Sequence, residues 1–407
     1  MNKKKDSKVV PNVRFKGFTD DWEQRKLTEI VNRVNKSSNS DVLPKVEFED
    51  IVSGEGRLNK DISSKFDSRK GTLFEPENIL YGKLRPYLKN WLFSDFEGVA
   101  LGDFWVFEAT DVSVPSFDYY LIQSDDYQKV ANDTSGTKMP RSDWKNVSST
   151  DFAIPSKDEQ KQIGAFFKQL DDTITLHQQK ITRLIKLKKA MLEKMFPKKG
   201  TVIPEIRFNG FANAWEQRKL GDIADVTKLA GFEFTEHVVY SDEGNIIALR
   251  GLNIKNGQLI LDDVKYIDGS NFSKLSRSKL FINDIMFTYV GTVGEVAIIK
   301  ENDRFYLAPN VSRIRVKSDD SPKFISHYMR TDNFKNKVIF PLIATSSQPA
   351  LSMENIRKFT INIPINREEQ DCLAKYFDSL DHLITLHQRK IDKIKNMKKA
   401  MLDQMFI

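Results

Sequence analysis

The sequence predicts an α+β protein in which two globular, sheet-containing domains are separated and joined by two long antiparallel coiled-coil helices. Two pairs of similar segments support this prediction. The stretch PNVRFKGFTDDWEQRKLTEI at 11–30 returns as PEIRFNGFANAWEQRKLGDI at 204–223. Likewise, LHQQKITRLIKLKKAMLEKMF at 176–196 returns as LHQRKIDKIKNMKKAMLDQMF at 386–406. One long block is therefore written twice, which predicts a pseudo-twofold internal repeat rather than a stacked solenoid.

Length and composition favour several well-packed globular parts. The chain has 407 residues, of which 40% are hydrophobic and 11% aromatic, and this length exceeds one ordinary core. The single cysteine, Cys372, leaves no internal disulfide and is typical of a reducing compartment. The opening MNKKKDSKVV lacks the apolar run of a signal peptide, and no stretch reaches the roughly 18 apolar residues of a membrane helix. We therefore expect a cytoplasmic protein with no membrane partner.

Between the repeated segments lie two blocks, 28–153 and 221–362, that share little beyond scattered positions. Strand-like stretches such as NIIALRGLNI and FYLAPNVSRIRVK are punctuated by Gly, Asn, Asp and Ser clusters. This pattern predicts one compact α+β domain in each block. The expected organisation is a first domain with its leader at 1–155, a central helix at 156–200, a second domain at 201–363 and a C-terminal helix at 364–407.

Each block is followed by a predicted helix of roughly 40 residues, or about 60 Å at 1.5 Å per residue. Pro155 and Ser156 mark the start of the first helix, and Pro364 and Asn366 mark the start of the second. Apolar side chains follow a 4-3 spacing in both, which is typical of a coiled-coil seam. The seam residues are Phe167, Leu170, Ile174, His177, Ile181 and Leu184 in the first helix, and Phe377, Leu380, Ile384, His387, Ile391 and Ile394 in the second.

Polar residues interrupt the seam at equivalent places in the two helices. His177 corresponds to His387, and Lys188 corresponds to Lys398. Polar residues in a seam commonly fix register and orientation at some cost in stability, so we interpret both pairs as parts of a structural helix pair. A metal or catalytic role for the histidines is the weaker alternative, because no carboxylate or cysteine accompanies them in the sequence.

Signatures of catalysis are missing. The phosphate-loop pattern G-x-x-x-x-G-K-[ST] does not occur, which argues against ATP hydrolysis by this chain. The Asn-Pro-Pro-Tyr and Asp-Pro-Pro-Tyr runs of amino-methyltransferases are also absent, and the five histidines form no zinc spacing. We expect a non-catalytic chain with no metal and no cofactor of its own. A nuclease carboxylate cluster scattered along the sequence is the open alternative.

Both blocks carry residues suited to binding nucleic acid. YGKLRPYLKNW at 81–91 interleaves basic and aromatic residues, and SGTKMPRSDW at 135–144 adds basic residues in a Gly/Ser-rich loop. Basic side chains bind phosphates or guanine edges, and a glutamine amide can read adenine. The net charge of +7 permits a polyanionic partner, although ordinary solvated loops are the alternative interpretation. The candidate DNA contacts are Tyr81, Lys83, Arg85, Tyr87, Lys89, Lys138 and Arg141 in the first block, and Arg250, Asn253, Lys255, Tyr289, Thr292, Arg313, Ser347 and Gln348 in the second.

Taken together, these segments resemble the specificity subunits of type I restriction-modification systems. The likeness rests on the two RFxGFxxxWEQRKL leaders, on YGKLRPY, on SSQPALS and on the paired LHQ…KKAML…MF helices, and it covers nearly the whole chain. In that family each variable block is a target recognition domain that reads one half of a bipartite site in double-stranded DNA. The paired helices space the two domains and dock two methyltransferase subunits, and two restriction subunits can then join.

The resemblance implies that S-adenosylmethionine, ATP and Mg²⁺ belong to the partner subunits. Because the two blocks differ, the two half-sites should differ as well. One departure lies where the second block has SSQPALS and the first has GTKMPRS, which sets Thr137 and Lys138 against Ser347 and Gln348. A coiled-coil scaffold without DNA specificity is the alternative function, and a self-sufficient nuclease or methyltransferase is the third hypothesis.

Overall fold

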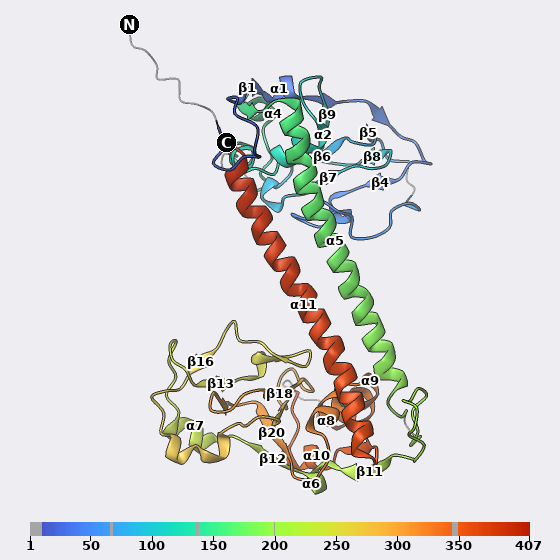
Figure 1. The fold of residues 1–407 in the computed structure, drawn as a ribbon, viewed down its shortest axis with the longest axis vertical. Helices are drawn as coiled ribbons and strands as arrows, with labels where there is room; N and C mark the ends of the chain where they lie inside the picture. The colour runs from blue at the N-terminus through green and yellow to red at the C-terminus, as the bar shows by residue number, and fades with distance from the viewer. Residues whose placement is uncertain (1–9, 66–67, 135–137, 199, 344–348) are drawn as a thin grey trace. The chain divides into compact units, whose positions relative to one another are not determined.

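A computed structural model describes residues 10–65, 68–134, 138–198, 200–343 and 349–407. The chain divides into two compact units. Unit 1 comprises Met1–Gln179 and Gln388–Ile407, and unit 2 comprises Lys180–His387. Each unit therefore contains one globular domain, one end of helix α5 (Lys157–Lys194) and one end of helix α11 (Arg367–Met405). Figure 1 draws α5 in green and α11 in red.

In unit 1 the ends of the two long helices run antiparallel. The rings of Phe167 and Phe406 lie 6.0 Å apart between centroids, and further along the pair Lys398 Nζ lies 2.7 Å from Asp171 Oδ1. Residue numbers thus rise along α5 as they fall along α11. Phe167, Leu170 and Ile174 of the predicted seam are buried on α5, and Ile391 is buried on α11.

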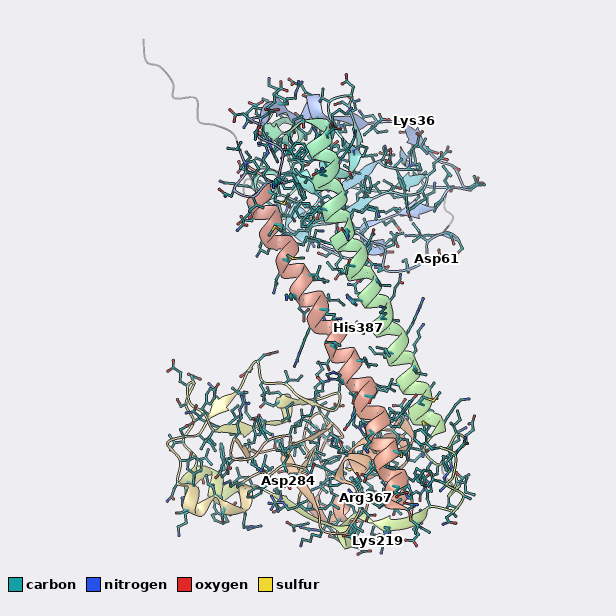
Figure 2. All side chains as sticks on the ribbon, in the orientation of Figure 1. Lys36, Asp61, Lys219, Asp284, Arg367 and His387 are labelled. Atoms are coloured by element: carbon teal, nitrogen blue, oxygen red, sulfur yellow. The ribbon has the colours of Figure 1, made fainter. Side chains whose placement is uncertain are left out.

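Unit 2 repeats this arrangement with the opposite ends of the helices. Lys188 forms an ion pair with Asp381, and the rings of Phe196 and Phe377 lie 5.5 Å apart. Phe377 and Leu380 of the predicted seam are buried. The remaining seam positions are half-buried in their respective units: His177, Ile181, Leu184, Ile384, His387 (labelled in Figure 2) and Ile394. The predicted α+β fold with an antiparallel helix pair and an internal repeat is confirmed.

The first domain contains two four-stranded sheets. A separate two-stranded antiparallel sheet, β1 (Glu23–Lys26) with β10 (Asp151–Ile154), joins the two ends of the domain. One sheet has the order β2 (Val31–Val34), β9 (Phe104–Ala109), β6 (Ile79–Gly82), β7 (Trp91–Phe93). The other has the order β3 (Ser37–Ser38), β5 (Gly71–Phe74), β8 (Gly98–Ala100), β4 (Lys45–Val46). The helices are α1 (Leu27–Ile30), α2 (Pro115–Leu121), α3 (Asp125–Ala131) and α4 (Trp144–Ser149), with short 3₁₀ turns η1 (Phe48–Asp50) and η2 (Pro86–Leu88).

The second domain repeats this plan. Its ends are joined by β11 (Glu216–Lys219) and β21 (Thr360–Ile363). Its four-stranded sheet has the order β12 (Ala224–Lys228), β20 (Val311–Val316), β17 (Ile285–Thr288), β18 (Val296–Ile298). A second sheet orders β16 (Lys265–Tyr266), β13 (Ile247–Leu249), β19 (Phe305–Leu307), beside the hairpin β14 (Ile254–Lys255) and β15 (Gln258–Leu259). The helices are α6 (Leu220–Ile223), α7 (Gly231–His237), α8 (Pro322–Met329), α9 (Asp332–Phe334) and α10 (Met353–Arg357), with the 3₁₀ turn η3 (Gly251–Asn253).

The sheet β2-β9-β6-β7 of the first domain and the sheet β12-β20-β17-β18 of the second domain have equivalent strand orders. The two blocks nevertheless share little sequence. The internal repeat therefore extends through the two blocks. Within them it is visible in the strand order and not in identical residues.

The repeated leaders anchor the long helices. Arg14 makes two hydrogen bonds of 2.7 Å to the carboxylate of Glu159, in the first turn of α5. Arg207 binds Glu369 in the first turn of α11 in the same two-pronged way, at 2.6 and 2.7 Å. Both glutamates are buried, so each needs this arginine to compensate its charge. This contact explains why the leader and the helix start are repeated together.

Candidate nucleic-acid interface

In the first domain the two candidate binding segments lie side by side. Leu84 and Arg141 form an isolated antiparallel bridge. The Arg85 amide donates to the Pro140 carbonyl at 2.7 Å, and the Ser142 amide donates to the Lys83 carbonyl at 2.9 Å. Residues 83–85 are thereby joined to residues 140–142, although more than fifty residues separate the two segments in the chain.

The second domain makes the same three contacts. Val290 and Ala350 form the bridge. The Gly291 amide donates to the Pro349 carbonyl at 3.0 Å, and the Leu351 amide donates to the Tyr289 carbonyl at 2.9 Å. The backbone around Val290 and Ala350 is therefore the structural counterpart of the backbone around Leu84 and Arg141. Each domain presents one hairpin tip joined to one loop, on equivalent backbone but with different side chains.

These contacts correct the sequence correspondence between the two loops. Pro140 and Pro349 accept equivalent hydrogen bonds, and the residues three positions on, Asp143 and Ser352, cap helices α4 and α10 through their side chains. Counting back from the prolines sets Met139, and not Lys138, against Gln348. The expected pairing of Lys138 with Gln348 is therefore one residue out of register. Ser347 and Gln348 themselves lie outside the described residues.

The first domain exposes several predicted contacts at its tip and loop. The exposed side chains are Arg85, Tyr87, Lys89, Lys138 and Arg141. Asp103 was not predicted, but it organises this surface because its carboxylate lies 3.0 Å from Arg141 and 3.7 Å from the half-buried Lys83. It follows a glycine just before β9, and nothing in that short pattern distinguishes it from an ordinary turn residue.

Tyr81 is a core residue, and the expectation that it contacts DNA is wrong. Its side chain is only 1% exposed, and its ring packs 5.3 Å from the ring of Tyr127 and 6.0 Å from that of Trp105. Burial raises the pKa of the Tyr81 hydroxyl to about 12. The physical reason is that Tyr81 lies on β6, where all four residues are buried, whereas Arg85 lies beyond the end of that strand.

Two predicted contacts in the second domain also have internal roles. Asn253 is fully buried; its Oδ1 accepts from the Arg250 amide at 3.0 Å, and its Nδ2 donates to the Asp263 carbonyl at 2.7 Å. Arg313 is 5% exposed and pairs with Asp225 on the neighbouring strand β12. Burial lowers the pKa of the Arg313 guanidinium. Direct DNA contact by these two side chains therefore contradicts the structure.

The other predicted residues of the second domain remain accessible. Lys255 and Thr292 are exposed, and Tyr289 is half-buried with Lys228 Nζ 5.5 Å from its ring centre. Arg250 is half-buried, and its Nη2 donates to Asp263 Oδ1 at 2.7 Å. DNA contact by these residues stays a prediction, as it does for the exposed residues of the first domain.

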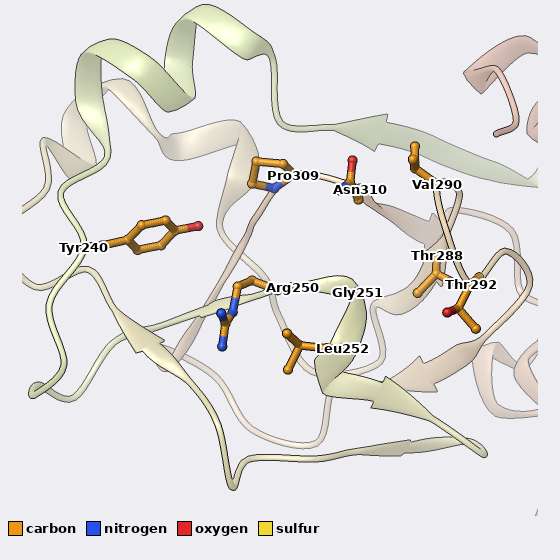
Figure 3. Close-up of a pocket in the computed structure, with 9 residues that line it drawn as sticks. All are labelled: Tyr240, Arg250, Gly251, Leu252, Thr288, Val290, Thr292, Pro309 and Asn310. Carbon is orange, nitrogen blue, oxygen red and sulfur yellow. Dashed lines mark hydrogen bonds between the residues drawn. The ribbon is translucent and has the colours of Figure 1, made fainter. Parts of the chain in front are cut away.

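A pocket of about 390 Å³ opens beside the second hairpin tip (Figure 3). It is lined by Tyr240, Arg250, Gly251, Leu252, Thr288, Val290, Thr292, Pro309 and Asn310. Arg250 and Thr292 were predicted from sequence, whereas Tyr240 and Asn310 were missed because they lie in segments far from both in the sequence. Among the described atoms, Arg250 Nε is buried and has no hydrogen-bond partner, while Nη2 of the same side chain donates to Asp263.

A difference between the domains accounts for the pocket. In the first domain Phe48 begins η1 and stacks on Phe104 at 4.5 Å. The same position in η3 is Gly251, which leaves the space of that ring open. Beside it, the first domain has Gly82, where an added Cβ would lie 2.5 Å from the Phe48 ring, and the second domain has Thr288.

The described residues contain no group of three or more His, Cys, Asp or Glu placed to hold a metal ion. In the same part of the chain, no helix is both long and apolar enough to cross a membrane. Each domain presents a solvent-facing surface built from a hairpin tip and an adjoining loop.

A family model for the type I restriction modification DNA specificity domain matches the chain twice, at residues 19–186 and 212–396. The chain belongs to this family. The two matches agree with the duplicated fold, because each covers one specificity domain and much of the long helix that follows it. The resemblance inferred from the leaders, loops and helices is thus confirmed.

Curated relatives of this chain include specificity subunits from two different organisms. The type I restriction enzyme MjaVIII specificity subunit of Methanocaldococcus jannaschii is 25% identical over 283 residues, covering 66% of this chain and 64% of that protein. The type I restriction enzyme HindI specificity subunit of Haemophilus influenzae is 26% identical over 190 residues, covering 43% of this chain and 41% of that protein. The matches span less than two thirds of either relative.

Solved structures share the fold of the paired specificity domains. The crystal structure of the type I restriction-modification S subunit from M. genitalium gives a TM-score of 0.63 at 12% identity, covering 98% of this chain and 99% of that one. A chain from the structure on complex assembly and conformational transition of the type I R-M system gives 0.53 at 16% identity, covering 94% and 96%. At these identities the likeness concerns the fold.

Proposed function

We propose that this chain is the non-catalytic DNA-recognition subunit of a type I restriction-modification complex. Each specificity domain reads one half of a bipartite, asymmetric site in double-stranded DNA through its hairpin tip and adjoining loop. The observation that carries the proposal is the pair of equivalent backbone surfaces bearing different side chains. Equivalent surfaces on a repeated frame suit two similar docking geometries, and unlike side chains suit two unlike half-sites.

The long helices then hold the two domains at a set spacing and dock two methyltransferase subunits in the cytoplasm. Two restriction subunits complete the nuclease form of the complex. S-adenosylmethionine, ATP and Mg²⁺ act in those partners. The curated relatives support this assignment, because their names describe specificity subunits of type I restriction enzymes.

Exchange of one block tests modular recognition. The site is first mapped from methylated positions in the host genome, and residues 28–153 are then replaced by the corresponding block of another family member. One half-site should change and the other should remain. A change in both half-sites contradicts the assignment of one half-site to each domain.

Salt dependence distinguishes this function from a protein-binding scaffold. Phosphate contacts release counterions, so the affinity of the chain with its methyltransferase partner for duplex DNA should fall steeply with added salt. Negligible DNA affinity in the presence of that partner would support the scaffold function instead. Methyl transfer by the purified chain alone would contradict the non-catalytic assignment.

A further inference from the structure

The hairpin tips of the two domains have the same backbone plan. In the first domain residues 83–90 connect β6 to β7, and the Gly82 amide donates to the Asn90 carbonyl at 2.7 Å. In the second domain residues 289–295 connect β17 to β18, and the Thr288 amide donates to the Glu295 carbonyl at 3.0 Å. The tips can therefore be compared position by position from their two ends.

Both tips contain two residues with left-handed backbone, but the residue types differ. In the second domain these residues are Gly291 at φ 77° and Gly294 at φ 95°. The corresponding positions in the first domain hold Arg85 at φ 49° and Lys89 at φ 54°. Left-handed backbone is unfavourable for residues with a Cβ, and glycine adopts it readily. The first tip therefore carries backbone strain that the second tip avoids.

The side chains of Arg85 and Lys89 do not stabilise the fold through polar contacts. Both are exposed, and neither side chain makes a hydrogen bond or an ion pair with another residue in the described part of the chain. Their backbone groups do serve the fold, since the Arg85 amide binds Pro140 and the Lys89 carbonyl accepts from the Gly54 amide at 2.9 Å. Glycine at either position would supply the same backbone groups. Strain that the fold does not need points to a function of the side chains.

We propose that Arg85 and Lys89 are the phosphate clamp of the first domain, and that the strained turn exists to aim them at the DNA backbone. This inference rests on the proposed DNA-binding function. The two cations flank Tyr87 and Leu88, which are 57% and 39% exposed, so an apolar tip lies between two free charges. Lys83 and Arg141, by contrast, are engaged by Asp103.

The clamp makes the two domains unequal. The second tip has glycine at both positions, so its backbone can approach DNA closely but supplies no charge there. Phosphate anchoring by the hairpin tip is therefore a feature of the first half-site, and the second domain depends more on contacts outside its tip. A phosphate clamp holds DNA of any sequence, so it adds affinity and salt dependence rather than base preference.

The test uses the double variant Arg85→Gly with Lys89→Gly in the assembled methyltransferase complex, with a duplex that carries the mapped site. Loss of two phosphate contacts should weaken binding by about tenfold or more. It should also make the slope of log affinity against log salt shallower by about two. Because strain is removed, the melting temperature should stay the same or rise by up to about 4 °C.

Three further double variants keep the test independent of folding. Arg85→Asn with Lys89→Asn removes the charges while asparagine still tolerates left-handed backbone, so it should bind as weakly as the glycine variant. Arg85→Lys with Lys89→Arg keeps both charges and should retain affinity and salt slope. Lys26→Gln with Lys129→Gln, exposed lysines of β1 and α3, controls for net charge and should change the slope little.

Unchanged affinity and slope in the glycine variant, with wild-type binding intact, would overturn the clamp and leave the proposed function standing. A lowered melting temperature in the glycine variant would also overturn it, because the side chains would then support the fold. Wild-type complex that does not bind DNA at all would instead contradict the proposed function.

Discussion

Lys188 on α5 forms an ion pair with Asp381 on α11, and the duplicate of this pair joins Lys398 on α11 to Asp171 on α5. Lys188 corresponds to Lys398 in the repeat, and Asp171 corresponds to Asp381. The lysine of each helix thus binds the aspartate of the other helix at equivalent positions. The seam lysines, which interrupt the apolar spacing, thus have specific partners in both units. The same lysine–aspartate ion pair therefore occurs once in each unit, and it favours one register of the two helices.

The two ion pairs should differ in their cost when broken. Lys398→Met leaves Asp171 with the Tyr120 hydroxyl at 2.9 Å, whereas Lys188→Met leaves Asp381 with the Arg330 guanidinium at 3.0 Å. An uncompensated buried charge is costly. We expect Lys398→Met to lower the free energy of unfolding by about 2 kcal/mol and Lys188→Met by about 1 kcal/mol.

Urea unfolding of the full chain measures both losses. Lys168→Met on α5 is the control, because Lys168 pairs with Asp172 while both are exposed, and exposed pairs of this spacing contribute about 0.5 kcal/mol or less. A loss for Lys398→Met no larger than for this control would contradict the structural role of the pair.

Asp381 predicts a specific acid sensitivity. Burial alone would raise the pKa of its carboxyl, but Arg330 and Lys188 outweigh burial and lower the pKa below the usual 3.8. The unfolded chain then binds more protons than the folded chain at acid pH. The stability from this carboxylate is therefore present above pH 3.8 and is lost as the pH falls through the lowered folded value.

Asp381→Asn removes that titration. We expect the variant to be less stable than wild type at pH 7, and the difference to shrink as the pH falls below 3.8. Urea unfolding at a series of pH values measures this difference. A difference that stays constant down to the lowest accessible pH would show that the charge of Asp381 does not contribute.

Much of the frame follows from the sequence alone, because the repeated residues there keep their identities. The 4-3 spacing of the apolar residues around Phe167 and Phe377 is enough to place both in a coiled-coil seam. The two similar leaders predict that the structure contains an internal repeat. The domains are different. Their common fold is held by burial and backbone hydrogen bonds, which accept many side chains, so two blocks with little shared sequence adopt one plan.

The binding surface shows the same limit at single residues. YGKLRPY alternates basic and aromatic residues, and this pattern does not reveal that Tyr81 belongs to a buried strand while Arg85 lies beyond its end. Asn253 and Arg313 have side chains typical of DNA contacts, but long-range partners, Asp263 and Asp225, commit them to the fold. Such partners become visible only when the chain is folded.

We expect that filling the pocket of the second domain with an aromatic side chain will improve packing and weaken DNA binding. Gly251→Phe with Thr288→Gly copies the Phe48 and Gly82 arrangement of the first domain. An added Cβ at Gly251 has its nearest neighbour 3.9 Å away, at Thr288 Cγ2, so the backbone accepts the change. We expect a folded chain whose affinity for the full site falls roughly tenfold through loss of the contacts near Arg250.

Competition binding to duplexes altered in one half-site at a time checks this prediction. The variant should lose discrimination at the second half-site and keep it at the first. Thr288→Gly alone controls for the hydrogen bond that the Thr288 hydroxyl accepts from the Glu295 amide at 2.9 Å. Full discrimination at both half-sites in the double variant would exclude the pocket from DNA recognition.

The spacing role of the long helices can be tested without disturbing either unit. The boundary between the units falls between Gln179 and Lys180 on α5 and between His387 and Gln388 on α11. Insertion of one heptad at both boundaries preserves the 4-3 spacing and leaves both lysine–aspartate pairs intact within their units. Seven residues lengthen each helix by about 10.5 Å, which corresponds to about three base pairs at 3.4 Å each.

We therefore expect methylation at the same two half-sites with a spacer longer by about three base pairs, mapped in the genome of cells that express the variant. Insertion of two residues at each boundary is the control, because it rotates the seam by about 200° away from its partner and should abolish methylation. An unchanged spacer with the heptad insertion would mean that the helices do not set the distance between half-sites.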